Sequence, residues 1–526
     1  MSELDVAAES ARGSFILLVG NLIQALTGVV FVIVVARLLG PSGYGSYTLA
    51  LLIPLTIQSL VGSGVSTGIT RYAAYHVARG EPEIARRMTL NGLLFLLLVG
   101  ALLTLVTYAG GAYLDQTILH RTDLGGVAGI ASLAILAQTL LGSATAGLLG
   151  WRAMKGISTA NVVWGVLRLG IAVPLIVVGF GVVGTVIGYV SATLLSGLLA
   201  FVILIFRLRG YGKGLPRNFA GDVGSVLSYG TPLYVGSVVT TVAGQYVVIV
   251  LALISSNAVV GVYQSALNVL IPISITSGAI AQSLFPSFAH LEGMKADVGL
   301  AFRYAVRYTA YFVAPMIFFI AGAARPLFDI IYGASFSSGI PYLVLLALAN
   351  IPLVLGYGIL PSLFNGVGKT RVSMVFSFVY AVLQVAFASL MAIILGLGVP
   401  GLISSILISS LGASAVGLWY SGRMLQAGVD WLKIGALALC SLLSCVVIIS
   451  VEAIVSDSAV ALVLDLVIFA AVYLSAVPVA RGLDSLDFSR LEGVTAGAGM
   501  LRVFLKPLLD YEQLVSKVTS GRPRAP

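Results

Sequence analysis

Long apolar segments separated by short polar ones follow each other along almost the whole chain. Fourteen of them contain about 20 apolar residues or more, enough to cross roughly 30 Å of hydrocarbon as a helix. Their bounds are 14–36, 44–69, 88–110, 125–150, 160–179, 182–206, 227–252, 259–288, 303–324, 339–365, 372–395, 400–422, 432–452 and 459–480. The pattern predicts an all-α polytopic membrane protein with about 14 transmembrane helices.

Composition agrees with this pattern. Of the 526 residues, 59% are hydrophobic and only 9% are charged, whereas a soluble domain carries about 25% charged residues. A soluble enzyme is therefore excluded. The net charge of +9 does not indicate a nucleic-acid partner, because the basic residues lie between the apolar segments.

The basic residues also predict the orientation. With the N-terminus in the cytoplasm, 25 of the 29 Lys and Arg residues lie on the cytoplasmic side. Only Arg37, Arg121 and Arg325 lie on the opposite side, and Arg168 falls within a span. The imbalance favours an even number of spans in a prokaryotic plasma membrane, bacterial or archaeal, with both termini cytoplasmic.

Two short patterns recur at equivalent places. Gly45, Tyr47, Ala50 and Leu51 recur 216 residues later as Gly261, Tyr263, Ala266 and Leu267, and the hairpin at 179–184 recurs at 396–401. We expect six-helix bundles at 1–222 and 223–425, related by a parallel repeat about an axis along the membrane normal. An additional helix pair at 426–480 and a cytoplasmic amphipathic tail at 481–526 follow, and we expect residues 486–518 of this tail to lie along the membrane surface.

Several motifs resemble those of a known family. They are Ala36-Arg-Leu-Leu-Gly-Pro-Ser-Gly-Tyr-Gly-Ser-Tyr47, Thr70-Arg-Tyr72, Ser228-Tyr-Gly-Thr-Pro232 and Asn365-Gly-Val-Gly-Lys-Thr370. Over roughly residues 10–425 the chain is similar to the oligosaccharide flippases of the multidrug/oligosaccharidyl-lipid/polysaccharide exporter superfamily. The last two spans resemble the extra pair of members such as the lipid II flippase, where that pair flanks a lipid-tail groove.

The resemblance implies a cargo and partners. The cargo would be an oligosaccharide on a polyprenyl (di)phosphate, moved from the cytoplasmic to the outer leaflet for the biosynthesis of cell-surface glycans. Membrane lipids and glycosyltransferases of the same pathway would be its partners. No cofactor and no nucleic acid is implied.

Arg168 is the main candidate for gripping the phosphate, because a charge inside a span is costly and usually functional. Asn161 lies seven residues earlier, on the same face of the predicted helix. A structural alternative is a snorkelling arginine, or one paired with a carboxylate such as Asp465. At the equivalent position of the second half stands Gln384.

Further candidates lie at the ends of spans and among the amides and aromatic residues. Arg71 ends the second span, where a diphosphate would first arrive, or it is an ordinary cytoplasmic anchor. Arg37 could act on the exit side or simply shape a loop. Trp164, Gln24 and Gln245, with Asn161 and Gln384, are candidates for contacts with sugars, and interhelical hydrogen bonding is the alternative for each.

Enzymatic signals fail on inspection. The run Gly366-Val-Gly-Lys-Thr370 lacks the earlier glycine of a phosphate-binding loop, since Leu363 stands there. His76, His120 and His290 lie in separate loops, and the carboxylates are expected mostly in loops or tails, with no pair inside the core. We therefore expect no catalytic residues and no metal site.

Two other functions compete with the flippase. A cation-coupled multidrug exporter of the same superfamily is the main alternative, although such exporters generally use acidic residues inside the membrane, and the first twelve spans contain no convincing one. A membrane-bound glycosyltransferase or ligase would require a larger extracytoplasmic loop than the sequence offers.

Overall fold

In the computed structural model, all regular secondary structure of the described residues is helical. The structure describes residues 3–118, 125–211, 218–452, 454–455, 457–483, 487, 507–508, 510–513 and 515. The chain divides into two compact units, unit 1 of residues 1–265 and unit 2 of residues 266–526. The predicted bundle bounds of 1–222 and 223–425 place the division earlier in the chain, and they stay a prediction.

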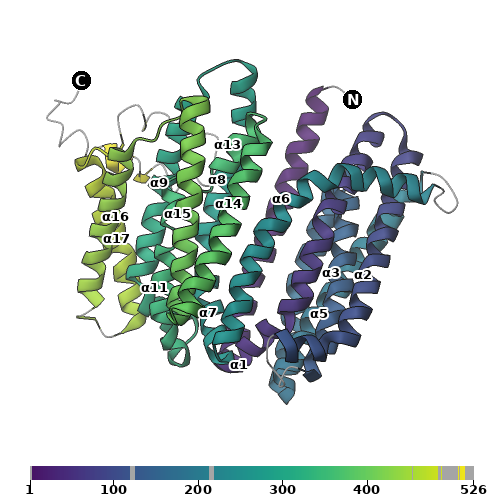
Figure 1. The fold of residues 1–526 in the computed structure, drawn as a ribbon, viewed down its shortest axis with the longest axis horizontal. Helices are drawn as coiled ribbons and strands as arrows, with labels where there is room; N and C mark the ends of the chain where they lie inside the picture. Colours follow the sequence, from purple (N-terminus) through teal and green to yellow (C-terminus); the bar gives the residue numbers. More distant parts are fainter. Residues whose placement is uncertain are drawn as a thin grey trace. The chain divides into compact units, whose positions relative to one another are not determined.

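Unit 1 is built from long helices (Figure 1). They are α1 (Glu3–Ala78), α2 (Pro82–Ile118), α3 (Gly125–Gly150), α4 (Met154–Leu175), the π-helix η1 (Ile176–Phe180), α5 (Gly181–Leu208), α6 (Phe219–Ile254) and most of α7 (Asn257–Val269). α3 packs between α2 and α5, and α4 packs against α1 and α5.

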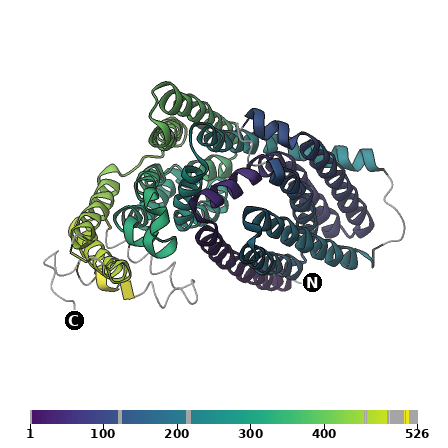
Figure 2. The ribbon, with the colours of Figure 1, turned by 90° about the horizontal axis from the view of Figure 1, so that it is seen from below.

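Unit 2 contains more short helices than unit 1, and it also contains more of the prolines of the chain. Its elements are α8 (Ile271–Gly293), α9 (Val298–Gly322), α10 (Ala324–Ile331), the 3₁₀-helix η2 (Ala334–Gly339), α11 (Ile340–Leu348), α12 (Ile351–Val354), α13 (Leu360–Gly366), α14 (Thr370–Ala388), the π-helix η3 (Ser389–Ile394), α15 (Gly398–Leu425), α16 (Trp431–Glu452) and α17 (Ser458–Val479). α16 and α17 lie side by side at the C-terminal end of this unit (Figures 1 and 2).

Each predicted span contains helix, but turns after Leu348 and after Val354 interrupt the span predicted at 339–365, and the helices do not separate all the spans. Within the described residues, ten helical segments are long and apolar enough to cross a membrane, or eleven if α7 and α8 count as one bent span. The protein is therefore a multi-pass membrane protein. The count of fourteen is not confirmed, because Val19–Leu60 and Met154–Leu208 are continuous segments of 42 and 55 residues.

Glycines mark the breaks inside these long segments. Gly40 has φ of 67° and ψ of 177° within α1, a conformation that only glycine adopts readily, and Pro41 after it has no backbone N–H. Gly179 inside η1 and Gly181 at the start of α5 have positive φ, as Gly396 after η3 and Gly398 at the start of α15 do. The two recurring hairpins therefore share a π-helix and two glycines of positive φ at its C-terminal end.

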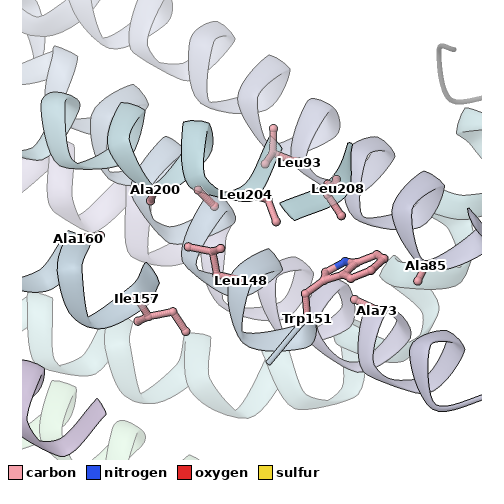
Figure 3. Packing of buried hydrophobic residues seen from close by; sticks show 11 residues of the cluster. Ala73, Ala85, Leu93, Leu148, Trp151, Ile157, Ala160, Ala200, Leu204 and Leu208 are labelled. Carbon is pink, nitrogen blue, oxygen red and sulfur yellow. The ribbon is translucent and has the colours of Figure 1, made fainter. Parts of the chain in front are cut away.

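The core of unit 1 is apolar, with few polar groups that are satisfied locally. Trp151 packs among Leu148, Leu204 and Leu208 (Figure 3), and its indole N–H donates to Thr89 Oγ1 at 3.1 Å. Such packing holds α2, α3, α4 and α5 as one framework, on which the polar side chains described next are positioned.

Candidate functional site

Unit 1 contains a polar cavity between α1, α3 and the start of α4. Its volume is about 550 Å³, and it is lined by Leu17, Asn21, Ser66, Thr67, Thr70, Arg71, Gly142, Thr145, Ala146, Leu149 and Ile157. The hydroxyls of Thr70 and Thr145 donate to helix carbonyls, Thr70 to Ala146 O at 2.9 Å and Thr145 to Leu141 O at 2.8 Å. Their oxygens remain acceptors beside the one cation of the lining, Arg71. We refer to this space as the Arg71 cavity.

Asn21 connects the cavity to α4. The Asn161 amide donates to Asn21 Oδ1 at 3.0 Å, so Asn161 lies at the cavity wall through its partner. Arg71 is exposed, and its guanidinium carbon lies 5.5 Å from the ring centre of Tyr72. An exposed guanidinium beside hydroxyl and amide groups can bind an anion with hydroxylated neighbours, such as a sugar phosphate.

Arg168 lies among aromatic rings, one face above Phe31 and another beside Trp164. Its guanidinium carbon is 4.2 Å from the Phe31 ring centre and 4.3 Å from that of Trp164, and the residue is 8% exposed. A Cβ on Gly28 would come within 3.3 Å of its Nη2, so the glycine leaves room for the guanidinium. We call Arg168, Phe31 and Trp164 the aromatic cage.

The cage is held in place by hydrogen bonds from its surroundings. The Trp164 indole N–H donates to Thr193 Oγ1 at 2.9 Å, and Gln138 donates to the Tyr189 hydroxyl at 2.6 Å. The rings of Trp164 and Tyr189 meet edge to face at 6.3 Å. In the described part of the chain Arg168 has no carboxylate partner, and its Nε has no hydrogen-bond partner.

The structure thus brings some predicted residues together and leaves others apart. Arg168 and Trp164 share the cage, and Asn161 and Arg71 are linked through Asn21. Gln24 and Gln245 are half-buried on α1 and α6, and Arg37 is exposed on α1. Gln384 is fully buried in unit 2, where it donates to Ser405 Oγ at 2.9 Å. Its position is that of an interhelical hydrogen bond.

Sequence reasoning missed a buried ion pair in unit 1. Arg87 of α2 donates from Nε and Nη2 to Asp222 of α6 at 2.9 and 3.2 Å, and Asn91 donates to the same carboxylate at 2.7 Å. Asp222 is 3% exposed. Arg87 is one of the basic residues that predict a cytoplasmic loop, and nothing local in the sequence indicates a partner 135 residues away.

Unit 2 buries a second network close to the C-terminal segment. Arg307 donates to Asp487 at 2.7 Å and to Asp430 at 3.0 Å, and the Tyr311 hydroxyl is 2.9 Å from Glu512. Burial raises the pKa of Glu512 to about 7. The predicted surface helix at 486–518 lies mostly outside the described residues, and of those described Glu512 faces the protein interior.

An apolar groove runs between α16 and α17. Its volume is about 790 Å³, and its lining is Ala436, Leu439, Cys440, Leu443, Ala471, Val472, Ser475, Ala476, Val479 and Ala480. Ser475 is its one hydroxyl residue, and that oxygen lies 2.9 Å from the hydroxyl of Tyr511. The groove can hold an apolar chain, because small residues leave space and aliphatic ones supply the walls.

Solved structures show the same fold. The lipid II flippase MurJ, in an inward closed conformation, is similar with a TM-score of 0.72 at 14% identity, over 88% of this chain and 98% of that chain. An inward-facing multidrug resistance MATE family transporter gives 0.62 at 20%, over 79% and 95%. A transporter of the same superfamily from Pyrococcus furiosus gives 0.55 at 19%, over 82% and 96%.

Comparison with curated protein sequences found no match, whereas a family profile did. The profile described as polysaccharide biosynthesis protein matches residues 10–292, which is more than half of the chain. This match and the shared fold confirm the resemblance expected from the motifs. The chain belongs to the polysaccharide biosynthesis protein family, with the fold of the multidrug/oligosaccharidyl-lipid/polysaccharide exporter superfamily.

Proposed function

We propose that this protein is a flippase, which moves a polyprenyl-(di)phosphate-linked oligosaccharide from the cytoplasmic to the outer leaflet for the biosynthesis of cell-surface polysaccharide or glycan. The observation that carries the proposal is the Arg71 cavity, a cationic and hydroxyl-lined space of about 550 Å³ within otherwise apolar helices. Such a cargo has an anionic, hydroxylated head that must be shielded from hydrocarbon, and a tail that need not be.

The two candidate surfaces match the two parts of this cargo. Arg71 can pair with phosphate oxygens, and Ser66, Thr67 and Asn21 can hydrogen-bond to sugar hydroxyls. The groove of α16 and α17 suits an isoprenoid chain, since its lining is almost entirely aliphatic. Arg168 would attract the phosphate during transit, and Trp164 would stack on a sugar. The family description and the name of the similar lipid II flippase support this assignment.

A topology of fourteen spans fits the helices. The segments Val19–Leu60 and Met154–Leu208 are long enough for two crossings each at 1.5 Å per residue. The breaks at Gly40 and at Gly179 to Gly181 lie where a turn is needed. If each of these two segments crosses twice, the ten apolar segments give twelve crossings. Helix α6 and the bent pair of α7 and α8 then bring the number to fourteen. We place both termini in the cytoplasm of a prokaryotic cell, with the protein in its plasma membrane.

The repeat is supported by a contact between equivalent residues. Gly45 of α1 and Gly261 of α7 face each other so closely that a Cβ on either would clash with backbone atoms of the other segment. Asn257 also donates to Ser46 Oγ at 2.9 Å. Equivalent residues that touch each other are expected close to a two-fold axis. The similar backbone conformation of the two glycine hairpins also supports the repeat.

A cation-coupled multidrug exporter is the second candidate, favoured by the likeness to MATE family transporters. Such a protein would have to bind hydrophobic cations. Arg71 and Arg168 would repel them from both candidate sites of unit 1, which is why we prefer an anionic cargo.

The test uses purified protein in proteoliposomes and a fluorescent polyprenyl-diphosphate disaccharide, followed by a membrane-impermeant quencher. A hydrogen bond to a charged group is worth about 1.5–3 kcal/mol, so Arg71→Ala should slow flipping roughly 10- to 100-fold. Arg79→Ala is the matched control, because Arg79 is exposed in the turn directly after the same helix and contacts Tyr75. It should stay within about twofold of wild type.

A wild-type protein that exports a cationic dye and leaves the labelled lipid in place would refute the flippase. Equal slowing by Arg71→Ala and Arg79→Ala would refute the Arg71 cavity as the binding site, because general surface charge would then act instead.

A further inference from the structure

Two carboxyl groups meet at the end of the α16–α17 hairpin. Glu452 is the last residue of α16, and Asp465 lies seven residues into α17, which begins at Ser458. Seven residues are about two helical turns, so Asp465 lies well inside an apolar helix. The two side chains interact directly. The expectation that carboxylates form no pair inside the core holds at most for the twelve-helix part, and it overlooked this hairpin.

Asp465 is buried without the donors that a carboxylate requires. It is 0% exposed, and no N–H or O–H group of the described residues donates to its Oδ1 or Oδ2. Glu452 is half-buried, and its Oε1 also has no donor in the same part of the chain. The interaction between the two carboxyl groups therefore involves oxygens that no donor of the described residues satisfies.

Two ionised carboxylates share such a position only at a high cost in free energy. Each has only acceptor oxygens, and like charges in contact repel while burial penalises both. The effective cost of burying one unpaired ion is several kcal/mol. A single proton between them removes one charge and creates an O–H donor for the other oxygen, so it satisfies both groups at once.

The other charges that face the pair do not supply this neutralisation. Arg325 and Asp329 of α10 act on Glu452 with opposite signs. Arg325 is exposed, so water screens it, and Asp329 accepts a hydrogen bond from Ser458 at 3.1 Å. Cys445, two turns before Glu452 on α16, is a free thiol that also faces it.

We propose that Glu452 and Asp465 form a proton-binding site that holds one exchangeable H⁺. On uptake, a proton from solvent forms an O–H bond with one carboxylate, and the second carboxylate accepts a hydrogen bond from it. On release the O–H bond breaks, the proton returns to water and two carboxylates remain. Glu452, at the helix end and only half-buried, is the route to solvent, and Asp465 keeps the proton from leaving freely. The site stands whether or not the cargo is a lipid-linked glycan.

The test measures proton binding and needs no substrate. Infrared difference spectra of the full-length protein in nanodiscs are recorded across a pH titration, with the protonated carboxyl stretch as readout. Glu512 can also hold a proton near neutral pH, so wild type should show, beside the band that Glu512→Gln removes, a second carboxyl band that Asp465→Asn and Glu452→Gln each remove. Glu292→Gln is the matched control, since Glu292 is an exposed glutamate of the same unit, and it should leave the band unchanged.

Glu452→Gln covers the case in which Asp465→Asn does not fold. The Gln amide can donate permanently to Asp465, so this variant should fold and its thermal stability should lose the decline with rising pH that the wild-type pair produces. A band unchanged in Glu452→Gln, or an equally steep decline, would overturn the proposal. Repeating the titration with Na⁺ in place of choline tests the ion, because displacement of the band by Na⁺ would refute a site for protons alone.

Discussion

Arg168 of unit 1 and Asp465 of unit 2 are both buried in apolar helices, and their surroundings differ. Arg168 is enclosed by the rings of Phe31 and Trp164, at 4.2 and 4.3 Å. Asp465 faces a second carboxyl group, that of Glu452. Aromatic faces stabilise a cation without neutralising it, whereas two carboxyl groups in contact require a proton to coexist.

This difference suggests that unit 1 binds an anion and that unit 2 binds H⁺. A buried cation that keeps its full charge, with no carboxylate partner in the described part of the chain, attracts an anion. Buried acids attract H⁺, and among the described residues of unit 2 three acids have at most 1% exposure, Asp465, Asp487 and Glu512. Arg307 compensates Asp487, which leaves Asp465 and Glu512 as the acids that can hold a proton near neutral pH.

The largest expected effect is the pH dependence of the docking of the segment around Glu512, a residue that lies outside the predicted spans. Its pKa is raised by burial to about 7 from an ordinary 4.5. Between these values the docked segment binds more protons than the released one, so its stability falls as the pH rises and levels off above about 7. The shift corresponds to about 3 kcal/mol, or roughly 300-fold in hydrogen-exchange protection of the described residues around Glu512.

The matched pair for this experiment is Glu512→Gln and Asp510→Asn. Glu512→Gln keeps a polar group at Tyr311 and should make protection independent of pH, once intrinsic exchange is corrected for. Asp510 is exposed on the same segment, and its variant should keep the wild-type slope. A wild-type protein without any slope between pH 5 and 8 would show that Glu512 is ionised where it lies, and the contrast between the units would be weaker.

Arg168 comes next. Arg168→Met keeps an unbranched side chain between Phe31 and Trp164 and removes the charge, so folding should survive and flipping should fall roughly 10- to 100-fold. The flipping rate of Arg168→Lys should lie between those of wild type and Arg168→Met, since lysine keeps the charge and lacks the planar, bidentate guanidinium. The measurements are thermal unfolding and flipping of the labelled lipid.

Arg209→Met is the control for stacking itself. Arg209 lies 4.2 Å from the ring centre of Phe206 and is exposed at the end of α5. Its variant should transport at the wild-type rate. If Arg168→Met flips lipid normally and is unstable, the cage is a packing device and unit 1 grips the anion elsewhere.

Much of the fold could be predicted from hydrophobicity, because a span is a local property. Each of the fourteen predicted segments contains helix, and breaks such as those at Gly40 and Gly179 fall at glycines. Which helices join across a break was not predictable, since a glycine next to a proline permits a turn or a kink equally well. The domain division likewise depends on packing between distant helices.

The candidate site was predictable only along single helices. Asn161 and Arg168 were placed on one face of the predicted helix by their spacing. In the structure both lie on α4, where Trp164 stacks on Arg168. Phe31, which completes the cage, is 137 residues away from Arg168 in sequence, and no local pattern marks it. The pairing of Glu452 with Asp465 was not predictable from the hairpin alone, because Glu452 ends α16 whereas Asp465 lies about two turns into α17.

The smallest expected effect concerns the groove of α16 and α17, and it tests whether unit 2 holds the apolar part of the cargo. Ala476→Trp would fill part of the groove and displace one or two CH₂ groups of a bound chain, at about 0.8 kcal/mol each, so flipping should slow roughly four- to fifteenfold. Val467→Trp is the control, since Val467 lies on the same helix, is 60% exposed and does not line the groove.

The decisive comparison is between carriers of different length. A diphosphate sugar on a short isoprenoid cannot fill the groove, so Ala476→Trp should flip it as fast as wild type does, while a long isoprenoid should be slowed. Equal slowing of both carriers would mean that the tryptophan disturbs the helix pair itself, and the tail would then have to lie in lipid, with unit 1 alone recognising the cargo.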